Sequence, residues 1–544
     1  MKTRNVHNLP LLAISFLLAL IAYSTILNSF FLSDDFEQIG RVLEGDWSFT
    51  WGLEQGGFFR PLFIWSYVVD GTLWGTNPFG YHLTNIALHA LNSYLVYILS
   101  GRLLRRNGHD AAISLRISAA AGLIFLLLPS HTEAVSWISG RADLLATVFS
   151  LAALIFYDSY MRERSSSYLA ATVGFFMLAL LAKESALCLP LIIIAMELSV
   201  AADQRQAVDL KQVIRAGVLL GLILLVYLLI RYAAIGSFIG GYGPRHHLNF
   251  NVSLIWERLP KYFVRALLPP LPHQLSFMLF KPFKSRAFIA FAVMFVGALS
   301  TLIVFRHRWQ SPTTRKQQNV VLLLLLILFL CSLLPVITMG ISVFDTSGER
   351  LVYLPSVFTS IAIAYIVAAF IANPKLWILS VGCLLIFYSA NLYRSNQRWR
   401  EAANLSKSIL NDLASLSRHD DLLVMNAPDS LQGAPVYQNG LTKALTTFQR
   451  TKKIRHLDLV SLHSLLSTTD VIEMVRESNL VSMRLLDAKA EFSRINDQME
   501  CVEIRRRSQT SLTVELKECV QGKDVFYFQK GKMVELSAFQ SAFP

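Results

Sequence analysis

Charged residues adjoin apolar runs at four places in the sequence, and these places are where chemistry is expected. Ionisable side chains in or beside membrane-length apolar segments are costly, so they are candidates for function. If the runs are membrane spans, all four groups reach the same outer face, and this convergence is the clearest functional signal in the sequence. The groups are Asp34 with Asp35, then His131, Glu133, Arg141 and Asp143, then Lys183 with Glu184, and finally Glu349 with Arg350.

Acids and bases together at a membrane surface favour group transfer. Two adjacent acids repel each other, so one member of the pair Asp34 and Asp35 can have a raised pKa and act as a general base. Arginine and lysine hold anions, and the anion at headgroup depth is a phosphate. The combination predicts transfer of a group from a lipid phosphate to an acceptor. The structural alternatives are a solvated acidic pair at a helix end, and a helix-start acid for Asp143 beside Arg141.

A metal site is a second hypothesis for the same region. His131 and Glu133 lie two residues apart, a spacing that can hold a divalent metal on extended backbone, with a third ligand from the acidic pair. Pro129 just before them indicates a turn instead. The sequence therefore names His131 and Glu133 as candidate ligands and leaves metal dependence open.

The composition predicts that most of the chain lies in a membrane. Hydrophobic residues make up 53% and charged residues 16% of the 544 residues, against roughly 25% charged in soluble domains. Eleven apolar runs approach the length of about 20 residues that crosses a bilayer. They cover residues 9–32, 81–99, 113–128, 144–160, 168–181, 186–200, 216–232, 288–305, 320–337, 352–372 and 376–393.

The loop charges predict the topology. The N-terminal tail and the five loops expected inside hold 16 Lys and Arg and four acids, which places the N-terminus in the cytoplasm and the C-terminus outside. Residues 33–80 then form a large first outer loop, in which 63–74 is expected to be an interfacial helix. The basic segment 231–286 also lies outside, and the prolines and charges of 254–280 indicate a non-spanning segment. Positive loops explain the net charge of +13 without nucleic acid.

The composition changes after Tyr393. Residues 395–544 have the character of a soluble domain, with strands expected at 422–426, 511–519 and 526–529 and helices at 401–416 and 440–448. We expect a small extracytoplasmic α+β domain following a membrane domain of residues 1–394. Cys501 and Cys519 lie in this domain and could form a disulfide in an oxidising compartment.

Several motifs, taken in order, resemble a known family. Over about residues 10–400 the sequence resembles the transmembrane, TPR-containing protein O-mannosyltransferases and their bacterial relatives. The motifs are Phe59-Arg60-Pro61-Leu62, Tyr81-His82-Leu83-Thr84-Asn85, His89-Ala90-Leu91-Asn92, Pro129-Ser130-His131-Thr132-Glu133-Ala134-Val135, Ser139-Gly140-Arg141-Ala142-Asp143, Ala182-Lys183-Glu184, Leu189-Pro190-Leu191, Glu349-Arg350-Leu351-Val352-Tyr353-Leu354-Pro355 and Arg398-Trp399.

This resemblance implies a polytopic α-helical glycosyltransferase of the GT-C class. The sequence departs from the family at the C-terminus, where we expect an α+β domain in place of TPR repeats. Such an enzyme takes a sugar, for which mannose is one candidate, from a polyprenyl-phosphate carrier and transfers it to a protein or glycan acceptor at the outer face of a membrane, here a bacterial inner membrane. The resemblance implies catalytic roles for Asp34 or Asp35 and for Glu133 and Asp143. The substrate-binding candidates are Arg60, His131, Arg141, Lys183, Glu184, Glu349 and Arg350.

Two other classes of protein remain open. A transporter or flippase of lipid-linked precursors also gathers charges near headgroups, although it places them near the membrane midplane and commonly has inverted repeats, which the sequence does not show. A membrane receptor would use residues 395–544 as a partner module, but it would not need acids and bases in four separate outer loops.

Overall fold

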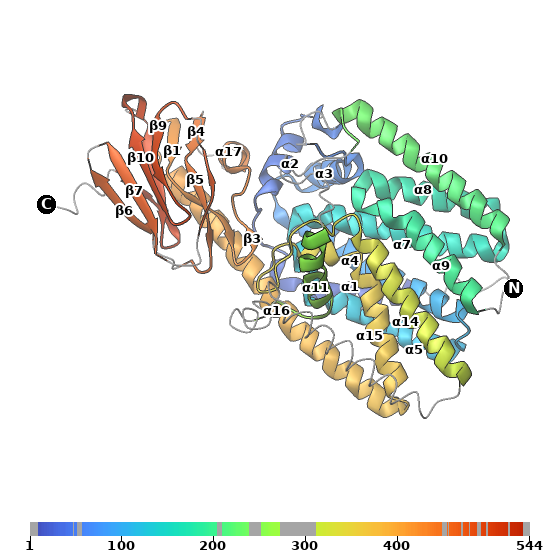
Figure 1. Ribbon diagram of the computed structural model, residues 1–544. Helices are drawn as coiled ribbons and strands as arrows, with labels where there is room; N and C mark the ends of the chain where they lie inside the picture. The colour runs from blue at the N-terminus through green and yellow to red at the C-terminus, as the bar shows by residue number, and fades with distance from the viewer. Residues whose placement is uncertain are drawn as a thin grey trace.

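The protein combines a helical bundle with a C-terminal β-rich region, as the computed structural model in Figure 1 shows. The structure describes residues 9–46, 48–51, 57–203, 209–238, 252–271, 312–448, 454, 456–468, 472–477, 479–486, 491–496, 499–520 and 523–536.

Ten of the eleven predicted apolar runs overlap helices, and the run 288–305 lies outside the described residues. Several of these helices begin at a side-chain cap: Asp110 accepts hydrogen bonds from the backbone N–H groups of Ala112 and Ile113, and Asn373 accepts from those of Lys375 and Leu376. The helices are α1 Leu9–Ala22, α4 Pro78–Arg106, α5 Ala111–Leu127, α7 Arg141–Glu163, α8 Ser166–Ala182, α9 Leu189–Asp203, α10 Leu210–Ile235, α14 Pro312–Leu333, α15 Ser356–Phe370 and α16 Pro374–Leu416.

The described helices identify a membrane protein, but they do not confirm eleven spans. Three are long and apolar enough to cross a bilayer: Ile138–Glu163, Leu210–Ile235 and Pro374–Leu416. Ala111–Leu127 and Pro129–Ser136 would add a fourth as one span bent by 54°. Shorter apolar helices complete the bundle, and apolar side chains such as Ile21 and Ile386, each 71% exposed, face outward as lipid contact requires.

The first apolar run is not helical to its end. α1 stops at Ala22, a short 3-10 turn covers Ser24–Ile26, and α2 begins at Asp34. Phe31 and Leu32 are buried against residues of the C-terminal region instead of facing lipid. The end of the run at 27–32 is therefore part of a connection between helices, and its hydrophobic side chains pack in a protein core.

Short elements connect the long helices at the end of the bundle that carries the four charged groups. The sequence predicts this to be the outer end, and these elements are called the outer connections. The predicted interfacial helix at 63–74 corresponds to α3, Pro61–Trp74. In the segment 254–280, α11 occupies Val252–Leu267, with Trp256 59% exposed, and residues from 272 onward lie outside the described part. The remaining connections are α2 Asp34–Leu43, α6 Thr132–Ser136, and the 3-10 turns η3 Pro129–His131, η4 Ile138–Gly140, η5 Glu184–Cys188 and η8 Glu349–Val352.

The C-terminal region contains β-sheets, as expected of an α+β domain. Its described strands pair into three four-stranded sheets with the orders β12-β11-β1-β4, β6-β7-β10-β9 and β3-β2-β5-β8. Cys501 and Cys519 form a disulfide. The strands are β1 Asp421–Val424, β2 Ala427–Leu431, β3 Ala434–Pro435, β4 His456–Leu459, β5 Ser461–Leu465, β6 Ile472–Glu477, β7 Leu480–Leu485, β8 Phe492–Ile495, β9 Val502–Arg507, β10 Ser511–Leu516, β11 Asp524–Gln529 and β12 Lys532–Glu535.

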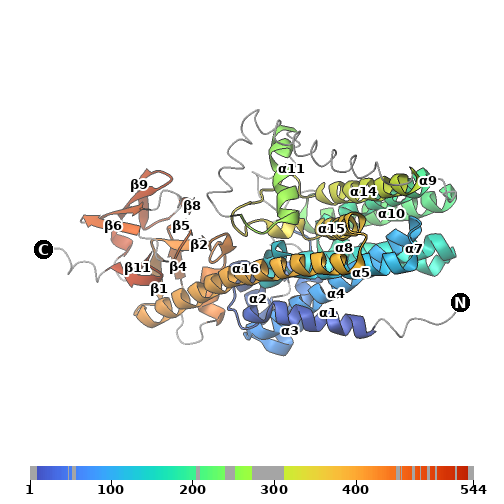
Figure 2. The ribbon, with the colours of Figure 1, turned by 90° about the horizontal axis from the view of Figure 1, so that it is seen from below.

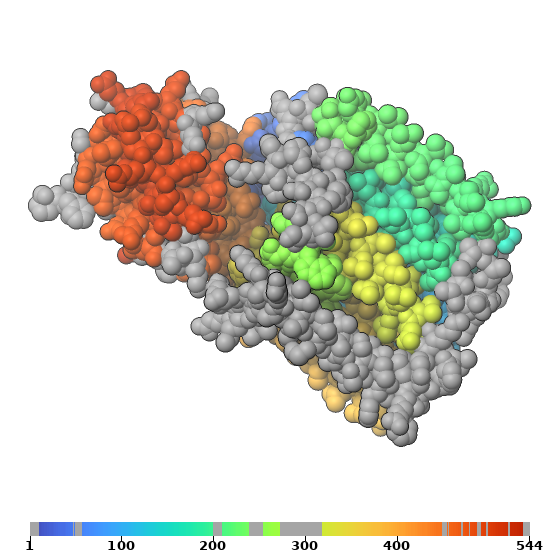
Figure 3. Space-filling model, viewed as in Figure 1, coloured from blue at the N-terminus to red at the C-terminus, as the bar shows by residue number. Residues whose placement is uncertain are grey.

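One helix joins the two parts. α16 runs unbroken through the predicted boundary at 394/395, from the bundle to the sheets (Figure 2). In Figure 3 the sheets form a lobe, coloured orange to red, at one end of the bundle. The hydrophobic core of this lobe also includes Phe36, Tyr67 and Trp137 from the outer connections of the bundle. The outer connections are thus packed between the two parts.

Candidate active site

The two members of the acidic pair have different surroundings at the start of α2. Asp35 is 1% exposed, and its carboxylate accepts hydrogen bonds from the backbone N–H of Leu32 at 3.0 Å and from the N–H and hydroxyl of Ser139 at 2.9 and 2.5 Å. Burial raises the pKa of Asp35 to about 7, although these hydrogen bonds oppose the rise. Asp34 is only half-buried, and its carboxylate accepts from the side-chain amide of Asn439 at 2.7 Å.

Asp35 connects the first outer loop to the second. Its partner Ser139 lies in η4, where Gly140 packs so closely that a Cβ atom would come within 2.5 Å of the carbonyl oxygens of Glu133 and Ala134. A residue with a side chain does not fit at position 140, so this close approach requires glycine. The second outer connection is therefore a tight double turn. It places Ser139 next to Asp35, and it places Glu133 next to the last outer connection.

Glu133 binds Arg350. Its two oxygens accept hydrogen bonds from the backbone N–H of Arg350 at 2.8 Å and from its guanidinium at 2.9 Å. The Arg350 guanidinium lies 4.8 Å above the Trp137 ring, and the Trp137 indole donates to the carbonyl of Leu32 at 3.3 Å. The Arg350 side chain is 26% exposed, so a cation that solvent reaches is connected to Asp35 of the acidic pair through Trp137 and Leu32.

Glu349 is fully buried beneath this surface. It accepts from the Thr132 hydroxyl at 2.8 Å and forms an ion pair with Arg265, which is also fully buried. Burial raises the pKa of Glu349 to about 7, and Arg265 opposes the rise. The pair links α11 to the connection before α15.

Arg141 is completely buried and surrounded by protein acceptors. Its guanidinium donates to the Asn85 side chain at 2.8 Å and the Tyr81 carbonyl at 2.9 Å, and it forms an ion pair with Asp70 at 2.6 Å. It also lies 4.9 Å above the Tyr67 ring. These contacts hold α3, α4 and α7 together, so the structure favours a positioning role for Arg141.

The remaining charged candidates form two further ion pairs. Lys183 is 3% exposed and contacts both oxygens of Asp143, at 2.6 and 2.7 Å. Arg60 binds Glu184 with two hydrogen bonds, one of 2.9 Å. Burial pushes the pKa of Glu184 upward, but Arg60 outweighs it and leaves the pKa at about 2. Glu184 is thus a charged partner of Arg60.

His131 and Glu133 point to different partners. His131 is fully buried, bonds to the Ser356 hydroxyl at 2.7 Å and packs on the rings of Phe125 and Tyr353. In the described part of the chain, no group of three or more His, Cys, Asp or Glu side chains could hold a metal ion. The aromatic surroundings of His131 do not resemble a metal centre, and no chemical step is assigned to a metal.

Sequence reasoning missed the residues that bind the predicted ones. Asp70 and Asn85 hold Arg141, Arg265 pairs with Glu349, and Ser139 and Asn439 bind the acidic pair. Asn85 and Ser139 each lie inside a motif that resembles the family, and this was the available signal. No sequence signal pointed to Asn439, which lies 405 residues from Asp34.

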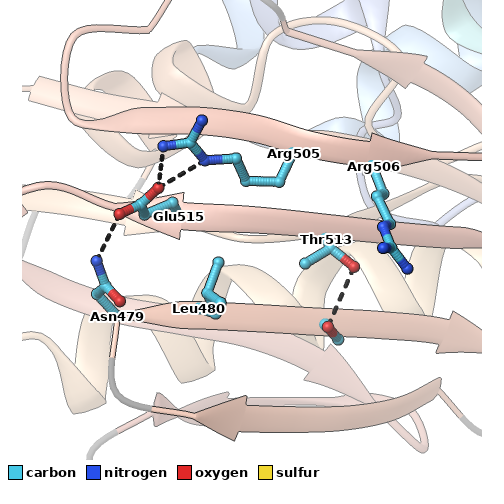
Figure 4. A pocket seen from close by; sticks show the side chains of 7 residues that line it. Asn479, Leu480, Arg505, Arg506, Thr513 and Glu515 are labelled. Carbon is cyan, nitrogen blue, oxygen red and sulfur yellow. Dashed lines mark hydrogen bonds and ion pairs between the residues drawn. The ribbon is translucent and has the colours of Figure 1, made fainter.

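A surface pocket of about 420 Å³ lies far from these residues in the sequence (Figure 4). It is an open depression on the sheet that contains β7, β9 and β10, and Arg505, Glu515 and Asn479 form a hydrogen-bonded row across it. None of the predicted site residues lines it.

Comparison with known proteins identifies the relationship. No family model matches the chain. Protein O-mannosyl-transferase Tmtc1 of Drosophila melanogaster is 34% identical over 185 residues, which cover 31% of this chain and 20% of the relative. Human protein O-mannosyl-transferase TMTC2 is 37% identical over 119 residues, covering 22% and 13%. Over these segments the chain is similar to the protein O-mannosyl-transferases.

A third relative and one solved structure extend the comparison. Protein O-mannosyl-transferase F38B6.6 of Caenorhabditis elegans is 36% identical over 99 residues, or 18% of this chain and 14% of the relative. The chain thus matches a fifth or less of the length of these curated proteins. The structure of ArnT from Cupriavidus metallidurans bound to undecaprenyl phosphate covers 93% of this chain and 97% of its own at 12% identity, with a TM-score of 0.37, which supports no argument.

Proposed function

We propose that the protein is a membrane glycosyltransferase of the GT-C class that moves a sugar from a polyprenyl-phosphate carrier to an acceptor hydroxyl at the outer face of a bacterial inner membrane. Its relationship to the protein O-mannosyl-transferases supports sugar transfer, with mannose as one candidate. The acceptor is a hydroxyl of a protein or a glycan. The sheet lobe then lies on the extracytoplasmic side.

One observation carries the proposal. A half-buried carboxylate, Asp34, adjoins a buried carboxylate, Asp35, and the partly exposed guanidinium of Arg350 belongs to the same connected set of outer segments. Inversion at a sugar carbon needs a base for the acceptor and a cation for the leaving phosphate. The site supplies both groups.

The proposed reaction is a single displacement. Asp34 takes the proton of the acceptor hydroxyl, and the oxygen attacks the anomeric carbon of the sugar with inversion. The bond between this carbon and the phosphate oxygen breaks, and the polyprenyl phosphate leaves with the bonding electrons. Arg350 stabilises the charge on the departing phosphate.

The other predicted residues serve the geometry in this proposal. Asp35 is fully enclosed, so it positions the start of α2 through Ser139. Glu133 orients Arg350, and the pairs of Asp143 with Lys183 and of Arg60 with Glu184 hold the outer ends of α3, α7 and α8.

The test uses the purified full chain in vesicles with polyprenyl-phosphate mannose and a hydroxyl acceptor. Replacing Asp34 with Asn is expected to lower kcat by at least about 100-fold, the usual contribution of a general base. Asp46→Asn is the matched control, because Asp46 lies in the same outer loop and binds Arg41. Full transfer by Asp34→Asn would contradict the proposed base. Carrier flipping without sugar transfer would instead favour a transporter.

A further inference from the structure

The sheet lobe contacts the start of α2 through one short segment, residues 432–448. The carbonyl of Val436 accepts a hydrogen bond from the backbone N–H of Ser33 at 2.9 Å, directly before the acidic pair. At the other end of α2, Glu44 accepts from the Thr447 hydroxyl at 2.7 Å and pairs with Lys443. The helix that begins with Asp34 is therefore held at both ends by the lobe.

Asn439 contacts Asp34 from this segment. Its side-chain amide donates to one carboxylate oxygen of Asp34 at 2.7 Å, and Asn439 itself is exposed. A hydrogen bond to a carboxylate fixes its orientation. A general base needs a fixed orientation toward the proton that it takes.

Gly440 keeps Asn439 in place. Its φ of +81° is one that side-chain-bearing residues rarely adopt, and a Cβ atom would come within 2.9 Å of the Ser33 carbonyl and the Phe36 Cβ. The lobe backbone thus touches the turn that precedes Asp34. This close approach fixes the position of the Asn439 amide relative to the acidic pair.

The same segment reaches the connection that carries Arg350. The carbonyl of Gln432 accepts from the backbone N–H of Thr346 at 3.4 Å. At Gly433, φ is +86° and a Cβ atom would come within 2.7 Å of the Asp345 carboxylate. One stretch of the lobe therefore contacts both the proposed base and the loop leading to the proposed phosphate ligand.

We infer that Asn439 of the C-terminal lobe is a positioning residue for Asp34, so that the lobe completes the active site. This inference rests on the proposed function. It gives the lobe a part in the reaction in addition to any role in choosing acceptors.

The test compares three variants of the full chain in the vesicle assay. Asn439→Ala removes the donor, and Asn439→Asp replaces it with a like charge of the same shape. Thr447→Val is the matched control, because it removes a hydrogen bond of the same segment to α2 that does not involve Asp34. Thermal unfolding is measured on each variant to separate loss of docking from loss of catalysis.

Asn439→Ala is expected to lower kcat by roughly threefold to tenfold, because the hydrogen bond that it removes is exposed to solvent and acts on the base without touching the reacting atoms. KM for the donor should stay unchanged, because the Asn439 amide orients the base and makes no proposed contact with the carrier. Asn439→Asp should lower kcat further, because two like charges repel and turn the Asp34 carboxylate away. Thr447→Val should leave kcat unchanged.

Wild-type kcat in both Asn439 variants would overturn the inference. So would an equal loss of kcat in Thr447→Val, since that would show a general effect of docking. Absence of transfer by the wild-type protein would contradict the proposed function itself, which keeps the two failures distinct.

Discussion

Asp34 and Asp35 are neighbours in sequence, yet their carboxylates serve different purposes. Helix α2 turns its first residue toward the solvent-accessible junction with the lobe and its second into the protein, where Ser139 and Leu32 bind it. The sequence alone does not show which of the two aspartates is buried. If α2 were rotated about its axis, the same dipeptide would have its first residue buried and its second residue exposed.

Asp35 should make stability depend on pH. Its folded pKa of about 7 lies above its ordinary 3.8, so the folded protein keeps a proton that the unfolded chain releases between about pH 4 and 7. Stability contributed by this group is present below pH 4 and is lost as pH rises to 7. Asp35→Asn cannot titrate, so its melting temperature should fall less over this window than that of the wild type.

Melting temperatures in detergent at pH 4, 5.5 and 7 check this expectation. Asp46→Asn is the control, because the folded pKa of Asp46, about 2, lies below the window. Identical slopes for the wild type and Asp35→Asn would show that Asp35 is charged in the folded protein.

Two arginines of the site should respond differently to loss of charge. Arg350 is partly exposed, so Arg350→Gln should lower kcat/KM by about 10- to 100-fold, since Arg350 stabilises the departing phosphate. Its melting loss should be smaller than that of Arg265→Gln, because the backbone N–H of residue 350 still donates to the buried Glu133. Arg265 is buried against Glu349, so Arg265→Gln should cost about 3–5 kcal/mol of stability by leaving a buried acid unpaired. Steady-state kinetics and denaturant unfolding separate the two effects, and equal melting losses would contradict the assignment.

At the scale of elements, the sequence predicted what depends on local pattern. Apolar runs predicted helices because a buried or lipid-facing helix needs continuous hydrophobicity, and the strands at 511–519 and 526–529 appeared as β10 and β11. The positive charge of the loops expected inside and the positions of the acids predicted that the four charged groups lie at one end of the helical bundle.

The pairings between elements were not predictable. Glu133 selects Arg350, 217 residues away, over the nearer Arg141, and Arg141 turns inward to Asp70. The partner of each charged side chain depends on how the helices pack against one another. The sequence pattern predicts only which face of each helix carries the charge. For the same reason, the run at 9–32 looked like one span although Phe31 and Leu32 belong to the lobe core.

The disulfide is an element-scale feature with a measurable effect. Cys501 and Cys519 close a loop with a sequence separation of 18. Closing a loop of this size lowers the conformational entropy of the unfolded chain, which raises the free energy of that chain by about 3 kcal/mol at room temperature. Cys501→Ser with Cys519→Ser should destabilise the lobe by roughly this amount.

Limited proteolysis of the lobe, compared with and without reductant, measures this loss. Replacing Cys383, a free and exposed cysteine in α16, is the control. Resistance equal to that of the wild type in the double variant would contradict the expectation.

At the scale of the whole molecule, the outer connections are packed into two cores. Tyr67 and Trp137 belong to the lobe core, whereas Phe59 and Val135 from the same connections belong to the bundle core. The site therefore depends on both parts being folded and docked.

Gly433 tests this dependence. A side chain at this φ of +86° is strained and meets the Asp345 loop, so Gly433→Ala should loosen the docked lobe and lower both transfer and melting temperature. Gly382→Ala is the matched control, since Gly382 lies within α16 with nothing within 4 Å of an added Cβ. Hydrogen exchange at 342–348 reports the docking directly, and unchanged exchange in Gly433→Ala would contradict the expectation.

The continuity of α16 also sets a rotational phase between membrane and lobe. The helix has 43 residues and is about 65 Å long, and each residue turns the chain by about 100°. Inserting one residue near the middle would rotate the lobe away from α2, whereas a seven-residue insertion would nearly restore its direction and lift it by about 10 Å. The number of residues between the bilayer and the sheets is therefore as much a property of the site as the identity of its acids.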